Sequence, residues 1–202
     1  MGASAPRKRM SAHERREQLL DVTKEIVGSE GFHAVSIEAV ARQAGITRPV
    51  VYEHFGDLAG LLEAMVGREG QRALLQLADI LPARLPEHGS PREDLLVALR
   101  GYLEAVAADP VTWRLVLMPP EGAPEVLRDR IAEGRNAVVV ALAEVVRPGL
   151  GSSAESPDPE LTARTLSAVT DEAARLLLTD PGTYPIARLV DHADWLLSRL
   201  AP

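Results

Sequence analysis

The side chains with the clearest chemical potential lie in residues 44–57, AGITRPVVYEHFGD. An arginine such as Arg48 can pair bidentately with guanine in the major groove of DNA, and small apolar groups can lie against a thymine methyl. Hydroxyl and imidazole groups can bond to phosphate oxygens, which positions a protein on DNA without reading its sequence. With one upstream serine, the residues that we predict to contact duplex DNA are Ser36, Thr47, Arg48, Pro49, Val50, Tyr52 and His54.

Three predicted helices position these side chains. Apolar residues recur at helical spacing over residues 11–30, with Ser11 as the cap. A second helix of about two turns follows Ser36 and ends at Gly45. A third helix begins at Thr47 and runs to about residue 54, and we expect the Thr47 side chain to accept a hydrogen bond from an amide of the next turn. The predicted order is therefore helix, helix, tight turn and helix.

The turn between the second and third helices is typical of a helix-turn-helix. Gly45 can adopt a left-handed conformation at low steric cost, so the two helices can cross steeply. The amino end of the third helix would then enter the major groove, while Val51 and Phe55 face inward. The alternative is a plain three-helix bundle in which Tyr52 and His54 are ordinary surface or core positions. A cap, a turn glycine and an amino-terminal arginine in one register favour the DNA-binding interpretation.

The run GFHAVSIEAVARQAGITRPVVYEHFGDLAGLL, residues 31–62, resembles the TetR family of one-component transcriptional regulators. The positions that match the family pattern are Gly31, Phe32, Ser36, Ile37, Val40, Ala41, Ala44, Gly45, Tyr52, His54 and Phe55. The resemblance implies a homodimer that binds an operator through this segment and is usually released by a small ligand. One departure is that family members often carry a lysine after the cap of the fourth helix, where it meets phosphate, whereas here Leu58 follows Asp57.

A basic arm precedes the predicted helices. The whole chain has a net charge of −7, yet residues 1–56 carry eight Lys or Arg against seven Asp or Glu, so the remainder holds a net charge of −8. Basic side chains dominate phosphate binding because they neutralise the DNA backbone. We predict DNA contacts for Arg7, Lys8 and Arg9 and hypothesise that they replace the missing lysine contact. The alternative is a solvated, disordered tail.

The composition predicts an all-α fold with two domains. The 202 residues include only seven aromatics, while the helix formers Ala, Leu, Arg and Glu are plentiful. We predict a three-helix helix-turn-helix DNA-binding domain over residues 1–56 and a larger helical ligand-binding and dimerisation domain over residues 57–202. The absence of cysteine excludes disulfides and thiolate metal sites. Without a long apolar run or a secretory signal, we expect a cytoplasmic protein with no membrane, metal or cofactor partner.

An enzyme is the rival class of function. Five histidines are scattered along the chain, and neither a metal-binding His-Glu-x-x-His nor a serine elbow nor a phosphate-cradling glycine loop occurs. The nearest approach to a catalytic set is Asp191, His192 and Asp194. Adjacent helical residues point in different directions, so we interpret this set as solvated surface.

The last two predicted helices carry apolar stripes. Family resemblance implies that such helices pair into a four-helix dimer interface, although both stripes could equally belong to the core. The predicted interface residues are Leu166, Val169, Ala173, Leu176, Leu189, Ala193, Leu196 and Leu197. A dimer would space two recognition helices by about one DNA turn, roughly 34 Å, which implies a nearly palindromic operator.

The ligand site is the least defined feature. The resemblance places the two helices around residues 102 and 113 beside an effector pocket, and such pockets are mostly apolar with a few polar groups. The candidate lining residues are Tyr102, Trp113, Leu117, Met118, Glu172 and Arg175. The alternatives are plain core for the first four and an exposed i, i+3 ion pair for the last two.

The resulting prediction is a DNA-binding repressor released by a small lipophilic effector. We expect an uncharged or weakly cationic ligand that tilts the fourth helix and so changes the distance between the two DNA-binding domains of the dimer. The alternative function is a ligand-independent repressor or a structural DNA-binding dimer.

Overall fold

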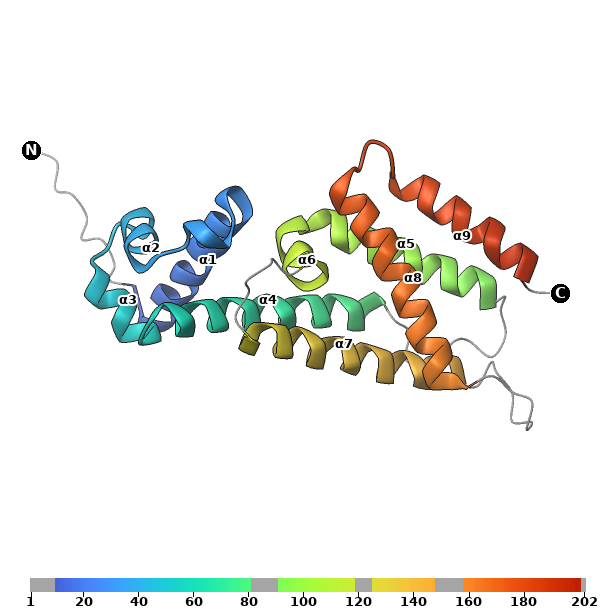
Figure 1. The fold of residues 1–202 in the computed structure, drawn as a ribbon, viewed down its shortest axis with the longest axis horizontal. Coiled ribbons are helices and arrows are strands. Elements are labelled where there is room, and N and C mark those ends of the chain that lie inside the picture. The colour runs from blue at the N-terminus through green and yellow to red at the C-terminus, as the bar shows by residue number, and fades with distance from the viewer. Residues whose placement is uncertain (1–9, 81–90, 119–124, 148–157, 201–202) are drawn as a thin grey trace, which may run out of the picture. The chain divides into compact units, whose positions relative to one another are not determined.

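The computed structural model describes residues 10–80, 91–118, 125–147 and 158–200, which form nine α-helices and one short 3-10 helix (Figure 1). No strand occurs within these ranges, and the predicted all-α class is confirmed. The elements are α1 Ala12–Glu30, η1 Phe32–Ala34, α2 Ile37–Ala44, α3 Arg48–Phe55, α4 Leu58–Ile80, α5 Pro91–Ala108, α6 Pro110–Leu117, α7 Glu125–Val146, α8 Pro159–Thr179 and α9 Ile186–Leu200.

Two compact units divide the chain, Met1–Gly67 and Arg68–Pro202. The division falls inside α4, whereas the sequence predicted it between residues 56 and 57. The physical reason is that the first turns of α4 carry Leu61 and Met65, both 0% exposed, so this part of the helix contributes to the core of the smaller unit. A single helix therefore belongs to two cores.

Helix α1 begins where its cap predicts. The Glu14 amide donates to Ser11 Oγ at 3.2 Å, and the Ser11 amide donates to Glu14 Oε2 at 2.7 Å. This reciprocal pair satisfies two amides that the helix leaves without internal partners. Hydrogen bonds from the backbone and side chain of Ser11 lower the pKa of Glu14. Helix α1 buries Leu19 and Ile26, and it contacts α2 and η1, the short helix that the sequence did not predict.

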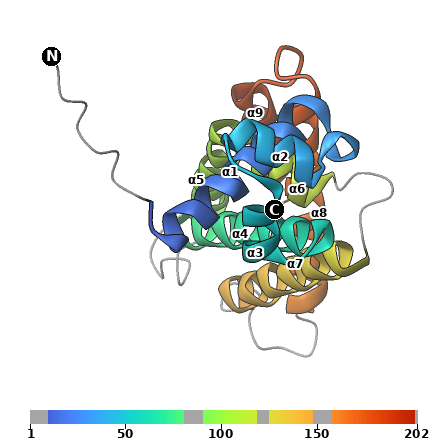
Figure 2. The same cartoon turned by 90° about the vertical axis from the view of Figure 1, so that its left-hand side faces the viewer.

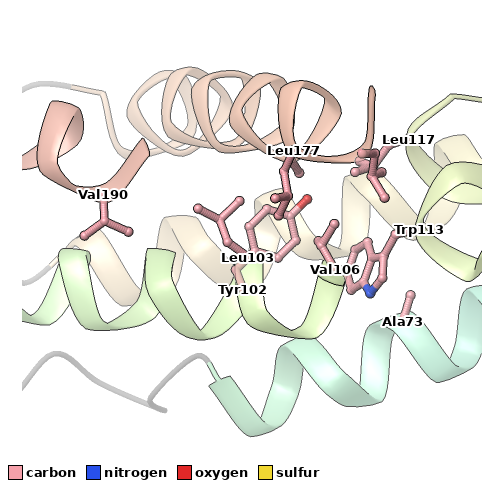
Figure 3. Packing of buried hydrophobic residues seen from close by; sticks show 10 residues of the cluster. Ala73, Tyr102, Leu103, Val106, Trp113, Leu117, Leu177 and Val190 are labelled. Carbon is pink, nitrogen blue, oxygen red and sulfur yellow. The ribbon is translucent and has the colours of Figure 1, made fainter. Parts of the chain in front are cut away.

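The core of the larger unit joins five helices (Figure 3). Trp113 of α6 is 1% exposed and meets the ring of Tyr102 from α5 edge to face, with centroids 5.2 Å apart. Around this pair lie apolar residues of α4, α5, α6, α8 and α9: Ala73, Leu103, Val106, Leu117, Ala174, Leu177, Leu178 and Val190. A second, smaller cluster of Val139, Ala143 and Ala163 packs α7 against α8, and the two views show these helices next to each other (Figure 1, Figure 2).

Polar contacts fasten the short helix α6 on two sides. Trp113 Nε1 donates to Gln76 Oε1 of α4 at 3.1 Å. On the other side, Arg114 Nη2 donates to the carbonyl of Leu178 at 2.9 Å, and Arg175 Nε of α8 donates to the carbonyl of Leu117 at 3.2 Å. Each contact satisfies a polar group near the core, so α6 is fixed to both α4 and α8.

Among the helices of the described ranges, none is both long enough and apolar enough to cross a bilayer.

A glycine near the start of α4 is required by packing and gives a first prediction. A Cβ at Gly60 would lie 2.2 Å from the carbonyl oxygen of Phe55. We expect Gly60→Ala to lower the free energy of unfolding by about 1–3 kcal/mol, as overpacked sites do, measured by urea denaturation. Gly134→Ala is the matched control, because a Cβ there meets nothing within 4 Å. A Gly60→Ala variant as stable as the wild type would contradict this packing.

Candidate nucleic-acid interface

The turn between α2 and α3 has the predicted left-handed glycine. Gly45 adopts φ 67° and ψ 35°, a conformation that a residue with a Cβ rarely takes. Its amide donates to the carbonyl of Arg42 at 3.2 Å, and the Ile46 amide donates to the carbonyl of Ala41 at 2.9 Å. These bonds close the carboxyl end of α2 in a Schellman-like manner, so the chain reverses within a few residues and α3 begins at once.

The start of α3 differs in one detail from the prediction. Thr47 occupies the cap position with extended backbone, but its side chain makes no cap hydrogen bond. Cap side chains accept from the second or third helical amide. Pro49 occupies the second position and has no N–H, while the third amide, that of Val50, donates to the backbone carbonyl of Thr47 at 3.1 Å. The expected side-chain cap is therefore wrong, and the exposed Thr47 hydroxyl is not used in this way.

Helix α3 has one buried face and one exposed face. Val51 is 0% exposed and Phe55 is half-buried, with the guanidinium of Arg16 lying 4.8 Å from the Phe55 ring centroid. On the opposite face Arg48 is exposed and Tyr52 is 49% exposed. Neither side chain forms a hydrogen bond or ion pair with another residue of the described ranges. Packing of the buried face thus holds the helix in place, while the polar face stays exposed to a binding partner.

The other predicted contacts have mixed surroundings. Ser36 Oγ accepts the amide of Ala39 at 3.0 Å and so caps α2, while its hydroxyl proton can still be donated. His54 is half-buried and lies tilted against Phe55, with ring centroids 6.1 Å apart. Asp57 caps α4 as expected, because its Oδ1 accepts the Gly60 amide at 2.8 Å. The basic arm residues Arg7, Lys8 and Arg9 lie outside the described residues.

The exposed front of α3 is a surface of hydrogen-bond donors. Arg48 brings a permanent positive charge and five N–H groups, and Thr47 and Tyr52 bring hydroxyls. The positive end of the helix dipole adds to the Arg48 charge. Such a surface can donate to phosphate oxygens and to the acceptor atoms of base edges.

The predicted effector residues do not all lie together. Tyr102, Trp113 and Leu117 meet in the core of the larger unit, whereas Met118 is 42% exposed at the end of α6. Glu172 is exposed and pairs with Arg175 at 3.1 Å, the i, i+3 alternative raised by the sequence.

A series of polar side-chain contacts that begins at Tyr102 was not predicted from the sequence. Tyr102 Oη donates to Asp171 Oδ1 at 3.3 Å, and Asp171 Oδ2 pairs with Arg135 of α7. Burial, and then the negative charge of Asp171, raise the pKa of Tyr102, which keeps its phenol protonated as a donor. The sequence could have indicated that Asp171 faces the core, because it shares one face of α8 with buried Ala174 and Leu178 at i, i+3 and i+7.

Seven of the eight predicted dimer residues are half-buried, and one is exposed. Val169 is 59% exposed, but Ala173 and Leu189 pack against the core of the larger unit. The remaining members are half-buried: Leu166, Leu176, Ala193, Leu196 and Leu197. Sequence reasoning missed Trp195 of α9, which is 52% exposed.

The exposed Trp195 belongs to a row on α9. His192 stacks on it with ring centroids 5.8 Å apart, and the Arg199 guanidinium lies 5.7 Å from the same ring. Their i, i+3, i+7 spacing in the sequence could have predicted that they lie on one face of the helix.

Two side chains of the set considered above for catalysis, His192 and Asp194, make structural contacts. Besides the stacking of His192, Asp194 pairs with Arg92 of α5 at 2.7 Å. Within the described ranges, no group of three or more His, Asp or Glu side chains could hold a metal ion.

Comparison with known proteins identifies the smaller unit. Residues 19–65 match the family described as "Bacterial regulatory proteins, tetR family". The HTH-type transcriptional activator FasR of Mycolicibacterium smegmatis is 29% identical over 108 residues, which are 54% of this chain and 48% of FasR. The chain thus spans about half the length of this curated relative.

Solved structures extend the likeness to the whole fold. A TetR-like transcriptional regulator from Rhodococcus sp. RHA1 aligns with a TM-score of 0.71 at 25% identity, over 95% of this chain and 97% of that one. SmeT, solved in complex with triclosan, aligns with a TM-score of 0.70 at 22% identity, over 89% of both chains, and shares the fold. The helix-turn-helix segment thus matches the model of the tetR family of bacterial regulatory proteins, and the chain as a whole is similar in fold to solved TetR-like transcriptional regulators.

Proposed function

We propose that this protein regulates transcription by binding duplex DNA through the amino end of α3. The observation that carries the proposal is the exposed pair Arg48 and Tyr52, which have no partner among the described residues and follow directly after the Gly45 turn, in the unit that matches the family. In this arrangement Arg48 reads base edges, Pro49 and Val50 contact a thymine methyl, and Tyr52 bonds to phosphate. Regulators of the tetR family are DNA-binding proteins without catalytic activity, and the chain is not an enzyme.

The basic arm extends the proposed contact. Arg7, Lys8 and Arg9 add phosphate contacts that depend on salt, with Ser36, Thr47 and His54 around the base-reading residues. The direction of regulation that we propose is repression, by occupation of an operator, although FasR is named an activator.

A homodimer is the proposed form that binds DNA. Two copies present two α3 helices about 34 Å apart, which matches one turn of the duplex and a nearly palindromic operator. The exposed apolar side chains Val169 of α8 and Trp195 of α9 support a contact through these two helices. Large aromatic side chains at interfaces commonly carry much of the binding energy.

A small lipophilic effector is the proposed release signal. The aromatic pair Tyr102 and Trp113 lies in a core formed by five helices, one of which is α4, the helix shared by both units. A ligand that prefers a rearranged core shifts the equilibrium towards a form that binds DNA less well. The triclosan bound by SmeT is an example of a lipophile bound by a protein of this fold.

Removal of the base-reading side chain tests DNA binding. Duplexes are first enriched from a random library with wild-type protein, and affinities are then measured by fluorescence anisotropy. We expect Arg48→Ala to weaken binding about 5- to 150-fold and to relax specificity at one base pair, and Tyr52→Phe to weaken all sequences alike.

Both variants should keep the wild-type melting temperature, since neither side chain is buried. Arg128→Ala, an exposed arginine on α7, is the matched control and should bind as the wild type does. If the double variant at Arg48 and Tyr52 binds every duplex normally, the proposed interface is wrong.

Truncation of Trp195 tests the dimer. We expect Trp195→Ala to weaken self-association about 30-fold, since interface aromatic hot spots contribute about 2 kcal/mol or more, measured by analytical ultracentrifugation. Val97→Ala on α5 is the matched control, because Val97 is 72% exposed but lies outside α8 and α9. A wild-type protein that is monomeric at micromolar concentration would contradict the dimer.

Reciprocal titrations test effector release. From a panel of lipophiles that begins with triclosan, a compound that raises the melting temperature is titrated calorimetrically with and without enriched duplex. We expect the duplex to lower ligand affinity by the same factor by which the ligand lowers duplex affinity. Ligand binding that is unaffected by the duplex would contradict release, and a panel without any binder would favour the ligand-independent repressor.

A further inference from the structure

A positive charge lies against the carboxyl end of α3. The guanidinium carbon of Arg16, near the start of α1, lies 4.8 Å from the centroid of the Phe55 ring. His54 lies tilted against the same ring, with ring centroids 6.1 Å apart. Arg16 is half-buried and forms no hydrogen bond or ion pair with another residue of the described ranges. An aromatic ring, rather than a carboxylate, therefore holds this guanidinium in place.

The contact with Phe55 leaves the donors of Arg16 unused. A guanidinium is planar, is always charged and carries five N–H groups. An ion pair would engage these groups and neutralise the charge, whereas an aromatic ring attracts the cation without removing either. Such a guanidinium suits a phosphate group, to which arginine can donate two parallel hydrogen bonds.

The sequence around Arg16 keeps the local charge positive. Residues 7–16 contain five Lys or Arg and one acidic residue, Glu14, in a chain whose net charge is −7. Glu14 is engaged by the cap of α1, because its Oε2 accepts the amide of the cap residue at 2.7 Å. Arg15 donates to Gln18, an uncharged partner. This turn of α1 therefore presents unneutralised positive charge.

Arg16 and Arg48 mark the two ends of α3. Helix α1 packs on α2 and α2 packs on α3, and the contact of Arg16 with Phe55 joins α1 to α3 directly. Phe55 follows Arg48 by seven residues, which is roughly 10 Å along a helix that rises about 1.5 Å per residue. The major groove is about 12 Å wide. A helix whose amino end reads base edges therefore brings its carboxyl end towards the phosphates that border the groove.

We propose that Arg16 is a phosphate-binding residue of the DNA interface and that Phe55 is the residue that positions it. In this arrangement Arg48 reads base edges at one end of α3, and Arg16 binds the backbone at the other end. The Arg16 contact carries no sequence information, because phosphates are the same at every base pair. This inference rests on the proposed DNA binding and adds a contact from α1 to it.

The salt dependence of binding tests the phosphate contact. Full-length protein is titrated with the duplex enriched on wild-type protein, and fluorescence anisotropy gives the affinity at several KCl concentrations. We expect Arg16→Met to reduce the slope of log affinity against log salt by about 0.9 for each chain bound, and to weaken all duplexes alike. Arg16→Lys should keep most of the slope, since it keeps the charge.

Melting temperatures and a matched control separate this effect from a change in fold. Methionine keeps an apolar contact with Phe55, so Arg16→Met should melt as the wild type does. If that variant does not fold, Arg16→Gln is measured in its place and is expected to lower the slope equally. Arg100→Met removes an exposed arginine of α5 and should leave the slope unchanged.

A double-mutant cycle tests the role of Phe55. Phe55→Leu keeps an apolar side chain but removes the ring, so Arg16 is no longer held at the end of α3. We expect Arg16→Met to weaken binding less in the Phe55→Leu protein than in the wild type. Effects of the two substitutions that simply add would overturn the positioning role.

The outcomes also separate this inference from the proposed function. A folded Arg16→Met protein with the wild-type slope overturns the phosphate contact. If Arg48→Ala weakens binding while Arg16→Met keeps that slope, this inference fails and DNA binding through α3 stands. If the wild-type protein binds no duplex, both fail.

Discussion

A single helix that contributes to two cores is the constraint on which the rest of the molecule depends. Helix α4 begins with the Asp57 cap, buries Leu61 and Met65 in the smaller unit, and buries Glu69 and Ala73 in the larger one. A helix advances 1.5 Å and turns about 100° for each residue, so the spacing of these residues along α4 decides which side chains each unit buries.

The elements around the interface could be predicted because their signals are local. Ser11 caps α1, Ser36 caps α2 and Gly45 supplies the left-handed turn, and each depends on the residue and its close neighbours in sequence. The failure at Thr47 is also local, since Pro49 removed one of the two amides that a cap side chain could use. A cap side chain needs a free amide at the second or third helical position, and here Pro49 lacks one while the Val50 amide donates to the Thr47 carbonyl.

Features that depend on contacts between distant residues escaped prediction. The carboxylate of Asp171 meets Tyr102 and Arg135 from two other helices, and nothing in the sequence near Asp171 reveals them. The same holds for Glu69, whose partner Thr112 lies on α6. The apolar stripes of α8 and α9 were recognised, but a stripe does not tell which members face the core, and here Ala173 and Leu189 do so while Trp195 is exposed.

The proline at the second position of α3 has a wider consequence. Most helices present several free amides at their amino ends, and these amides hold anions whatever the side chains are. In α3 one of these amides is absent at Pro49, and the amide of Val50 already donates to Thr47. The main chain at this end therefore offers fewer free amides than usual, so the proposed DNA contact would depend chiefly on side chains. A single substitution at the front of α3 would then change that contact while the fold is kept.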